Sequence, residues 1–477
     1  MPIRFGTDGW RAVISDEFTF ANVRLVAEAI ADYFIETKGS SPAPVVVGFD
    51  TRFLSDRYAM EASRILADLG LHVCLSKAAC PTPAMAFAIG ELHAMGGIMI
   101  TASHNPPRYN GIKFKAYHGG PGLPHETARI EQILERNMAQ ARNAPGNGES
   151  VWDMRKDYPG IARFDPMPAY EAHLRNIVDF GCIGASDLSV AVDPMYGAGR
   201  RHIASLLRDA GCRITEIHGE MNPGFGGIHP EPIERNLGDL TELMCGGQYD
   251  VGLATDGDAD RIGAVDADGA FVDPHRIFSL VLRHLVEVRR MRGAVVKTVS
   301  TTQLLNRLSG HYGLPLHETP VGFNHICELM LKQDVLIGGE ESGGITIRGH
   351  VPDGDGILMG LLLVELTAHW RRPLAQIIAD LMREHGEFHY GRNDVHTQAF
   401  DKKQLTKRLL QEVPKDILGH RVVNVNDRDG VKYVLDDDSW LLIRPSGTEP
   451  VLRIYAEARS RADVLPLLTA GAALARV

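Results

Sequence analysis

The segment Tyr249-Asp250-Val251-Gly252-Leu253-Ala254 runs directly into Thr255-Asp256-Gly257-Asp258-Ala259-Asp260-Arg261, which holds three aspartates in five residues. The first segment is typical of a buried strand. Carboxylates at alternate positions repel one another, so a strand end that carries three of them needs a neutralising partner. A hard divalent cation with oxygen ligands, commonly Mg²⁺, meets that need and often implies a phosphate nearby. Arg261 agrees with this interpretation, because a guanidinium group suits phosphate geometry.

Two structural alternatives compete with a metal site. Asp-Gly-Asp sequences are common in turns, because aspartate bonds its own backbone and glycine accepts a positive φ. An EF-hand also begins with alternating aspartates, but it needs glycine at position six and glutamate at position twelve, where this chain has Arg261 and Ala267. Open α/β sheets bind ligands beyond the carboxyl ends of their strands. We therefore predict a metal site made of Asp256, Asp258 and Asp260.

Length and composition limit the classes to which this protein can belong. The chain has 477 residues, 44% hydrophobic and 23% charged, which is ordinary for a soluble globular protein and predicts three or four domains. A net charge of −10 argues against nucleic acid as a partner. The N-terminus lacks the apolar core of a signal peptide, and the apolar stretch 357–364 is too short to span a bilayer and predicts a buried helix. The six cysteines show no CxxC spacing, so we expect a cytoplasmic protein without a membrane partner.

A strand–loop–helix pattern recurs along the chain. It begins at Pro44-Val45-Val46-Val47-Gly48-Phe49-Asp50, at Leu188-Ser189-Val190-Ala191-Val192-Asp193 and at Gly293-Ala294-Val295-Val296-Lys297-Thr298. Beyond residue 373, short apolar segments alternate with turns, which is typical of hairpin strands. We predict an α/β fold with three similar α/β domains with mixed sheets, followed by a smaller C-terminal α+β domain. The predicted ranges are 1–160, 161–265, 266–385 and 386–477.

A serine loop, Thr101-Ala102-Ser103-His104-Asn105-Pro106-Pro107, follows the apolar segment 97–100. A serine in a proline-stiffened loop after a buried strand can be a nucleophile or a phosphate carrier, and an ordinary turn with serine as a cap is the alternative. His104 and Asn105 can bond an anion. Lys113 lies ten residues after Ser103. A lysine near other cations can have a lowered pKa and move protons, whereas a solvated surface lysine is the alternative.

Two further loops carry groups suited to a phosphorylated sugar. Gly338-Gly339-Glu340-Glu341-Ser342-Gly343-Gly344 follows an apolar strand, and its carboxylates and hydroxyl can bind vicinal hydroxyls. A glycine-rich turn is the alternative there. Arg444-Pro445-Ser446-Gly447-Thr448-Glu449-Pro450 lies between two strands, the second of which carries Arg453. Arginines on both sides of a loop rich in N–H and hydroxyl donors favour a phosphate site over a plain hairpin.

In this order along the chain, the loops resemble those of the α-D-phosphohexomutase superfamily, which comprises phosphoglucomutases, phosphomannomutases and phosphoglucosamine mutases. The resemblance covers essentially the full length, from Phe5-Gly6-Thr7-Asp8-Gly9-Trp10-Arg11 to the C-terminal phosphate loop. Each loop alone is weakly or moderately specific, but four in the right order are jointly very specific. The resemblance implies that the domains surround a central active-site cleft.

The resemblance also implies a role for each residue singled out above. The counterpart of Ser103 carries a phosphoryl group and contacts Mg²⁺, which the counterparts of the three aspartates hold. Lys113 matches the candidate general acid/base. The residues matching those around the phosphoserine are Arg11, His104 and Arg261. The residues matching those that bind substrate are Glu340, Ser342 and His350 for the sugar, and Arg444, Ser446, Gly447, Thr448 and Arg453 for the phosphate that does not react.

The implied reaction interconverts hexose 1-phosphate and hexose 6-phosphate through a hexose 1,6-bisphosphate that reorients in the site. In relatives, glutamate at the position of Glu341 accompanies glucose, methionine accompanies dual use of mannose and glucose, and glutamine accompanies glucosamine. We therefore expect glucose, with phosphomannomutase activity as the first alternative and phosphoglucosamine mutase activity as the second. The chain departs from the pattern at Asn324 and His325, where many relatives have a lysine that meets the substrate. We expect His325 to bind substrate in its place.

Two other classes of protein are alternatives to a mutase. A sugar-phosphate-binding protein that has lost catalysis would be expected to lose the serine or an aspartate before the binding loops. A metal-dependent phosphatase needs a nucleophilic aspartate and open access for water. Ser103 and the three aspartates are all present, which favours the mutase. We expect small-molecule hexose phosphates as partners and a monomer or homodimer.

Overall fold

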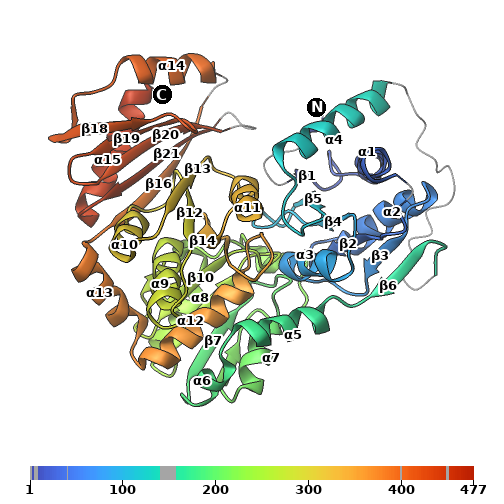
Figure 1. Cartoon of the computed structure of the whole chain (residues 1–477), viewed down its shortest axis with the longest axis horizontal. Helices are drawn as coiled ribbons and strands as arrows, with labels where there is room; N and C mark the ends of the chain where they lie inside the picture. The colour runs from blue at the N-terminus through green and yellow to red at the C-terminus, as the bar shows by residue number, and fades with distance from the viewer. Residues whose placement is uncertain are drawn as a thin grey trace.

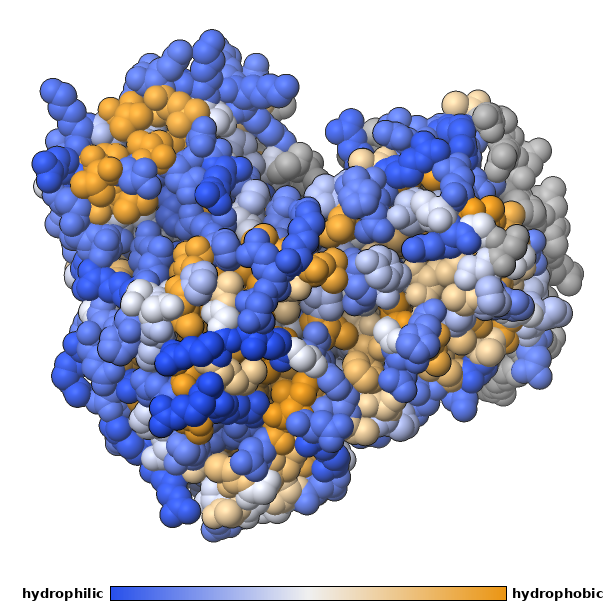
Figure 2. All heavy atoms as spheres, in the orientation of Figure 1, coloured by the Kyte–Doolittle hydropathy of each residue, from blue (hydrophilic) through white to orange (hydrophobic). Residues whose placement is uncertain are grey.

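The computed structural model describes residues 3–4, 9–39, 41–139, 157–397, 400–446 and 451–476. The chain forms four sheets in succession, each with its own helices (Figure 1). In the view of Figure 1 the N-terminal domain, in blue, and the C-terminal domain, in red, lie on opposite sides of the two middle domains. Figure 2 shows that the surface is deeply notched between these two outer domains.

The first domain is built on β2, a strand of branched apolar residues that is buried along its whole length. Such a strand is typical of the centre of a parallel sheet covered on both faces by helices. The sheet order is β1-β5-β4-β2-β3-β6. Its elements are β1 (Trp10–Val13), α1 (Phe20–Lys38), β2 (Val45–Phe49), α2 (Ser55–Asp68), β3 (Val73–Ser76), α3 (Thr82–Glu91), β4 (Gly96–Ile100), β5 (Tyr109–Ala116), α4 (Pro124–Ala139) and β6 (Ile161–Phe164).

The second sheet has the order β11-β10-β9-β7-β8 and a core of its own strands and helices. Its central strands β7 and β9 are fully buried. Its elements are α5 (Met167–Ile177), α6 (Phe180–Gly184), β7 (Ser189–Asp193), α7 (His202–Asp209), β8 (Arg213–Glu216), the short 3₁₀ segments Phe225–Gly227 and Glu234–Asn236, α8 (Gly238–Cys245), β9 (Val251–Thr255), β10 (Ile262–Asp266) and β11 (Phe271–Val272).

The third sheet has the order β13-β12-β14-β15. Its elements are α9 (Pro274–Glu287), β12 (Ala294–Thr298), α10 (Leu304–Tyr312), β13 (Leu316–Thr319), α11 (Phe323–Lys332), β14 (Val335–Gly339), β15 (Ile345–Ile347), α12 (Gly356–Trp370) and α13 (Leu374–His385). Helix α12 is buried without interruption over residues 356–368 and belongs to a core shared with the second sheet. The apolar stretch 357–364 therefore forms the buried helix that its composition predicts.

The first three sheets repeat one topology. In each, a central strand lies between two parallel neighbours: β2 between β3 and β4, β7 between β8 and β9, and β12 between β13 and β14. The later neighbour then pairs antiparallel with the next strand of the chain, as in β4–β5, β9–β10 and β14–β15. These three equivalent connections carry Ser103, the three aspartates and Glu340. The repeat thus confirms three similar α/β domains and places their chemical groups at corresponding turns.

The C-terminal domain differs, because its sheet is antiparallel throughout, in the order β16-β21-β20-β19-β18-β17. Its elements are β16 (His389–His396), α14 (Lys402–Gln411), β17 (Asp416–Ile417), β18 (His420–Asn426), β19 (Val431–Leu435), β20 (Trp440–Pro445), β21 (Val451–Ala458) and α15 (Arg461–Ala475). This confirms the predicted α+β domain with hairpin strands. In the described part of the chain, no helix combines the length and the apolar character needed to cross a membrane.

Candidate active site

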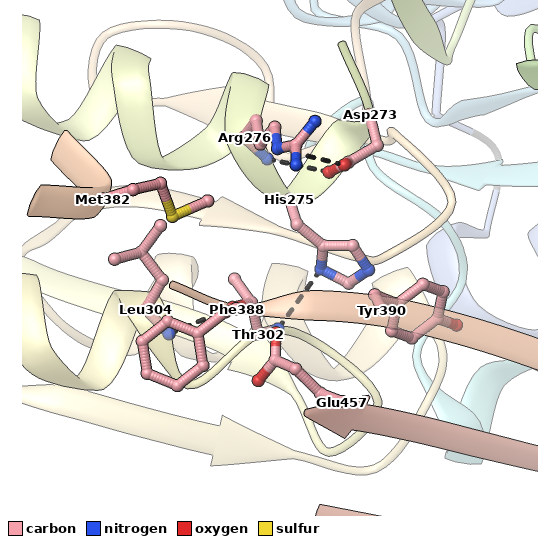
Figure 3. A pocket seen from close by; sticks show the side chains of 9 residues that line it. All are labelled: Asp273, His275, Arg276, Thr302, Leu304, Met382, Phe388, Tyr390 and Glu457. Carbon is pink, nitrogen blue, oxygen red and sulfur yellow. Dashed lines mark hydrogen bonds and ion pairs between the residues drawn. The ribbon is translucent and has the colours of Figure 1, made fainter. Parts of the chain in front are cut away.

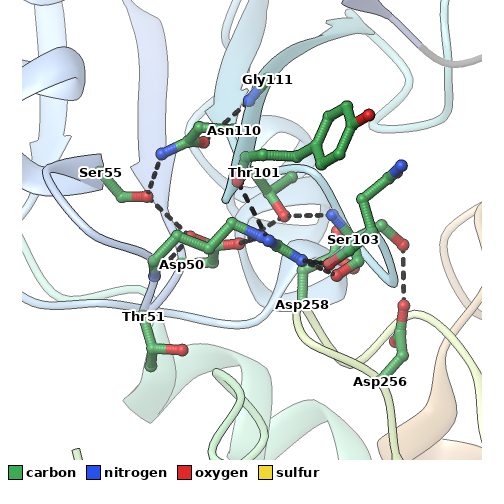
Figure 4. A network of polar contacts seen from close by, with 12 residues as sticks. Asp50, Thr51, Ser55, Thr101, Ser103, Asn110, Gly111, Asp256 and Asp258 are labelled. Atoms are coloured by element: carbon green, nitrogen blue, oxygen red, sulfur yellow. Dashed lines mark hydrogen bonds and ion pairs between the residues drawn. The ribbon is translucent and has the colours of Figure 1, made fainter. Parts of the chain in front are cut away.

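The serine loop of the first domain meets the aspartate loop of the second. The Ser103 hydroxyl donates a hydrogen bond to Asp256 Oδ2 at 2.7 Å, and both side chains are buried (Figure 4). The backbones also approach closely, because a Cβ at Gly257 would lie 2.4 Å from the carbonyl oxygen of Ser103. Only glycine tolerates such an approach. Position 257, between two aspartates, is therefore glycine because the Ser103 backbone packs against it as well as because the turn favours glycine.

The three aspartates of the loop form a donor set that suits a divalent cation. One carboxylate oxygen from each of Asp256, Asp258 and Asp260 lies within 4.8 Å of the others. Burial, followed by the charges of Asp260 and Asp258, raises the pKa of Asp256 well above its ordinary value. Asp258 Oδ1 is buried and has no hydrogen-bond partner within the described residues. A buried carboxylate oxygen without a partner is costly, so these groups fit a hard cation that prefers oxygen ligands.

Lys113, on β5, supplies positive charge to the same loop. Its Nζ lies 2.6 Å from Asp260 Oδ2 and 2.9 Å from Asp258 Oδ2, and its side chain is 1% exposed. Thr82, at the start of α3, donates its hydroxyl to Asp258 Oδ2 at 2.5 Å. Burial acts to raise the pKa of Asp258, but Lys113 and the Thr82 hydroxyl outweigh it and hold that pKa well below its usual range. Asp258 is therefore ionised at neutral pH, as a metal ligand must be.

Arg52 is not among the residues predicted from the sequence, yet it organises the serine loop. Its guanidinium group donates to the carbonyl oxygens of four loop residues: Ser103 (2.5 Å), Asn105 (2.7 Å), Pro106 (2.9 Å) and Tyr109 (3.0 Å). Ser103 has a φ of 52°, in the left-handed region that is uncommon for residues other than glycine. The bonds from Arg52 compensate for that strained conformation and aim the serine at the aspartates.

Asp50 completes this support from the end of β2 (Figure 4). Its carboxylate accepts hydrogen bonds from the hydroxyls of Thr101 (2.6 Å) and Ser55 (2.7 Å), and Arg52 Nε lies 3.1 Å from it. The signal that could have identified Asp50 and Arg52 was present in the sequence. Both follow the carboxyl end of a buried strand, which is the rule that singles out the aspartate loop.

Arg11, His104 and Arg261 surround the serine. Arg11 Nη1 donates to Asn105 Oδ1 at 2.9 Å, and the backbone N–H of Arg261 donates to Asp256 Oδ1 at 3.0 Å. Burial, followed by the charges of Arg261 and Arg11, holds the pKa of His104 well below its ordinary value. His104 is therefore neutral at pH 7. The structure thus brings every predicted catalytic and metal-binding residue to one place.

The predicted sugar-binding loop lies directly against the aspartate loop. The backbone N–H of Ile262 donates to the carbonyl oxygen of Gly343 at 3.3 Å, and Gly356 donates to Ala259 at 3.0 Å. Glu340 Oε1 accepts a hydrogen bond from the backbone N–H of Gly322 at 2.9 Å. Glu340 and Ser342 are both half-buried. The loop of the third domain therefore lies beside the three aspartates of the second, at the edge of the same site.

Among the predicted substrate-binding residues that the structure describes, His350 lies in a buried network instead. Its side chain is fully buried, with Nε2 bonded to Asp355 Oδ2 at 2.7 Å and Nδ1 3.1 Å from His173 Nε2. Tyr170 donates its hydroxyl to the same oxygen of Asp355 at 2.7 Å. Both ring nitrogens of His350 are engaged by protein groups, so the structure gives it a role in joining α5 to the start of α12.

The two arginines among the phosphate-binding residues predicted in the C-terminal domain lie on β20 and β21. Arg444 pairs in register with Arg453, and Arg444 Nε donates to Asp429 Oδ2 at 2.7 Å. Asp429 Oδ2 also accepts from the backbone N–H of Val321 at 3.0 Å, which links this hairpin to the segment before α11. His325 is half-buried on that helix. Ser446 is buried at the end of β20, whereas Gly447 and Thr448 lie outside the described residues.

Comparisons with known proteins agree with this arrangement. Four family models match the chain, all of phosphoglucomutase/phosphomannomutase: alpha/beta/alpha domain I at residues 2–141, domain II at 168–269, domain III at 273–385 and the C-terminal domain at 403–468. A phosphoglucomutase/phosphomannomutase of Thermococcus kodakarensis is 30% identical over 98% of this chain and 97% of its own length. A phosphoglucosamine mutase of Shouchella clausii is 29% identical over 96% of this chain and 94% of its own.

A solved structure extends the likeness to three dimensions. The crystal structure of a Thermus thermophilus protein assigned as a phosphomannomutase is 35% identical, covers 100% of both chains and superposes with a TM-score of 0.85. Three repeated α/β domains, a fourth antiparallel domain and a buried serine against three aspartates define a mutase-type isomerase that transfers phosphoryl groups. This chain belongs to the phosphoglucomutase/phosphomannomutase family, within the α-D-phosphohexomutase superfamily.

Proposed function

We propose that the protein interconverts glucose 1-phosphate and glucose 6-phosphate through a phosphorylated Ser103 and a glucose 1,6-bisphosphate intermediate. The observation that carries the proposal is the 2.7 Å hydrogen bond from Ser103 Oγ to Asp256, in a cluster of three aspartates, Lys113 and Arg261 of which Asp256, Asp258 and Lys113 are buried. A hydroxyl in that position needs charge neutralisation before it can carry a phosphoryl group, and the donor set around it fits Mg²⁺.

The proposed chemistry is symmetrical. In one half, the phosphoryl group passes from the Ser103 oxygen to a hydroxyl of the hexose monophosphate, which gives up its proton while the Ser103 oxygen takes one up. In the other half, the bisphosphate returns its other phosphoryl group to the serine, whose hydroxyl gives up its proton while the freed sugar oxygen takes one up. Mg²⁺, held by Asp256, Asp258, Asp260 and Ser103, would neutralise charge on the transferring group.

The protein's own residues have distinct tasks in this scheme. Lys113, within hydrogen-bond distance of two of the aspartates, is the proposed carrier of the proton exchanged with the sugar. Arg261 and Arg11 attract the phosphoryl oxygens, and the neutral His104 can donate a hydrogen bond to them. Glu340 and Ser342 bind sugar hydroxyls, while Arg444, Ser446 and Arg453 hold the phosphate that does not react.

The bisphosphate must turn over without leaving, so the site has to accept both of its orientations. A C-terminal domain that closes over the ligand would exclude water, whose attack on the phosphoserine would waste the phosphoryl group. Glu341 supports glucose as the sugar through its correlation with glucose in the superfamily. The names of two relatives refer to mannose and to glucosamine, so these sugars are the alternatives to assay.

Intact-protein mass spectrometry tests the phosphoserine. We expect a form that carries one phosphate, mapped by peptide analysis to Ser103, which glucose 6-phosphate removes. A Ser103→Ala variant supplied with glucose 1,6-bisphosphate should be inactive. Retention of the full isomerase rate in that variant would overturn the mechanism.

A coupled assay with glucose, mannose and glucosamine 1-phosphates, run side by side, tests the sugar. We expect the highest kcat/KM for glucose 1-phosphate. A higher value for mannose 1-phosphate would make the protein a phosphomannomutase and leave the phosphoserine mechanism untouched.

A further inference from the structure

Two tyrosine hydroxyls in the C-terminal domain are buried without a hydrogen bond. They belong to Tyr390 on β16 and Tyr455 on β21, and neither Oη has a partner among the residues described. The two rings lie on neighbouring strands, with centroids 6.5 Å apart. Figure 3 shows the Tyr390 ring beside His275, with its hydroxyl turned away from the other labelled side chains. Buried hydroxyls are normally satisfied, so a pair of unpaired ones calls for a partner.

Glu341, in the sugar loop of the third domain, is bonded by Ser300, and the neighbouring Val299 packs in one apolar cluster with Tyr455 and Tyr390. After burial, the charge of Glu341 is the largest influence that raises the pKa of Tyr390 and that of Tyr455. The same carboxylate also acts on Arg444, which lies on the strand next to Tyr455. The segment that holds Glu341 therefore packs against the face of the C-terminal domain that carries the two unpaired hydroxyls.

The position of Glu341 is set by hydroxyls of its own domain. Its Oε2 accepts hydrogen bonds from Ser300 Oγ at 2.7 Å and from Thr298 Oγ1 at 3.4 Å. A carboxylate offers about four acceptor positions, so these two bonds leave room for others. Glu341 is thus anchored on one side and has acceptor capacity for a further partner.

The loop that supplies those hydroxyls is itself held by both domains. Lys297 Nζ, from β12, donates to the carbonyl oxygens of Thr301 at 3.1 Å and Thr302 at 2.9 Å. Lys432 Nζ, from the C-terminal domain, donates to the carbonyl oxygen of Val299 at 2.6 Å. Both lysines are buried. The loop that holds Glu341 therefore contacts both domains.

We propose that Glu341 is a positioning residue that couples the sugar loop to the C-terminal domain by accepting hydrogen bonds from Tyr390 and Tyr455 when that domain closes. The proposal rests on the hexose phosphate mutase function proposed above. It assigns Glu341 no contact with the sugar. Glu341 affects catalysis by positioning Arg444 and Arg453. Its effect is therefore the same for every hexose phosphate.

A double-mutant cycle tests the coupling. Glu341→Gln, the Tyr390→Phe/Tyr455→Phe pair and their combination are assayed with glucose 1-phosphate and mannose 1-phosphate. Because hydrogen bonds to a charged acceptor are lost, we expect KM to rise about tenfold in each of the first two variants. The combination should show no further rise, since both changes remove the same interaction. The ratio of kcat/KM values for the two sugars and the phosphorylation of Ser103 should stay as in the unaltered protein.

Tyr433→Phe is the matched control, because the Tyr433 hydroxyl donates to the carbonyl oxygen of Leu409 within the C-terminal domain and away from Glu341. It should lower thermal stability and leave KM unchanged. Ser300→Ala provides a second route if the tyrosine variants unfold, and it should reproduce part of the rise in KM.

Three results would overturn the coupling. The first is a rise in KM in the combined variant that equals the product of the two separate rises. The second is a changed ratio of kcat/KM values for the two sugars in Glu341→Gln, and the third is an unchanged KM in Ser300→Ala. Absence of mutase activity in the unaltered protein would instead refute the proposed function.

Discussion

The two ends of the site are built in different ways. At the serine end, loops from three domains interlock, and the ionised groups are paired: Lys113 with Asp258 and Asp260, and Arg52 with Asp50. At the end formed by the C-terminal domain, Arg444 bonds Asp429, but Arg453 Nε and the Tyr455 hydroxyl are buried without hydrogen bonds in the described part of the molecule. At the serine end most charges are paired before substrate arrives and Asp258 Oδ1 is left without a partner, whereas the other end has an arginine nitrogen and a hydroxyl without hydrogen bonds among the described residues.

This contrast matches the different tasks of the two ends. Phosphoryl transfer depends on groups that need no rearrangement at the moment of reaction, so preassembly at the serine lowers the barrier. In the proposed mechanism, the other end must bind the phosphate of either orientation of the bisphosphate and then release it. Unsatisfied donors on a separate domain can bond the phosphate without first breaking bonds within the protein. Their contribution to the binding free energy is therefore made when the phosphate binds.

The largest effect is expected from breaking the donor set at the serine end. Removal of divalent metal with a chelator should abolish turnover, and added Mg²⁺ should restore it. Asp258→Asn should bind Mg²⁺ more weakly and lose about 10²-fold or more in kcat, because one ligand charge is gone. Steady-state kinetics across a range of Mg²⁺ concentrations checks both. Full activity of the unaltered protein in excess chelator would show that the aspartates hold no catalytic metal.

The next effect separates a catalytic lysine from a structural one on the same strand. Lys113→Met should lower kcat by about 10²–10⁴-fold, because it removes the proposed proton carrier. Lys115→Met is the matched control, since Lys115 forms a similarly buried ion pair with Asp353 at 2.6 Å two residues further along β5. That control should lose stability and keep most of its kcat. Equal loss of kcat in both variants would assign Lys113 a structural role only.

A smaller effect is expected at the C-terminal end. Arg453→Met should raise KM for hexose phosphates by about tenfold with little change in kcat, because a charge-assisted bond to phosphate is lost. Arg459→Met is its control, since Arg459 lies at the end of the same strand and stacks on Phe388 at 4.3 Å. A fall in kcat with unchanged KM in Arg453→Met would mean that this end takes part in the chemical step.

The smallest effect on activity is expected away from both ends, at Glu365 of α12. Burial opposes ionisation of this carboxylate, but hydrogen bonds from His284 and Arg289 prevail and lower its pKa to about 2. A pKa lowered by folding contributes stability that is complete above the ordinary value of 4.5 and is lost as the pH falls towards 2. Glu365→Gln should therefore cost about 3 kcal/mol of unfolding free energy at pH 6 and progressively less towards pH 3. Denaturant titrations at several pH values measure this difference, and a difference that does not change with pH would contradict it.

The prediction from sequence succeeded where a chemical group follows a strongly patterned strand. The loops at Ser103 and at the three aspartates each come directly after a buried strand, so their place at the edge of a sheet is a local property. It was weaker for His350, whose burial against His173 depends on how α5 packs beside α12. Arg52 was missed although it follows a buried strand, because its bonds to the serine loop depend on how that loop folds around it.

The sequence by itself determined the repeated strand–loop–helix units, the order of the four loops and the types of chemical group in them, because these follow from local hydrophobic pattern and turn chemistry. Only the tertiary structure decided that Thr82, Lys113 and Arg52 converge on the serine and aspartate loops, and that Val299, beside the serine that bonds Glu341, packs with two tyrosines of another domain. Those contacts join residues that lie far apart in the chain. Such pairings depend on how whole domains pack, and no local pattern in the chain encodes them.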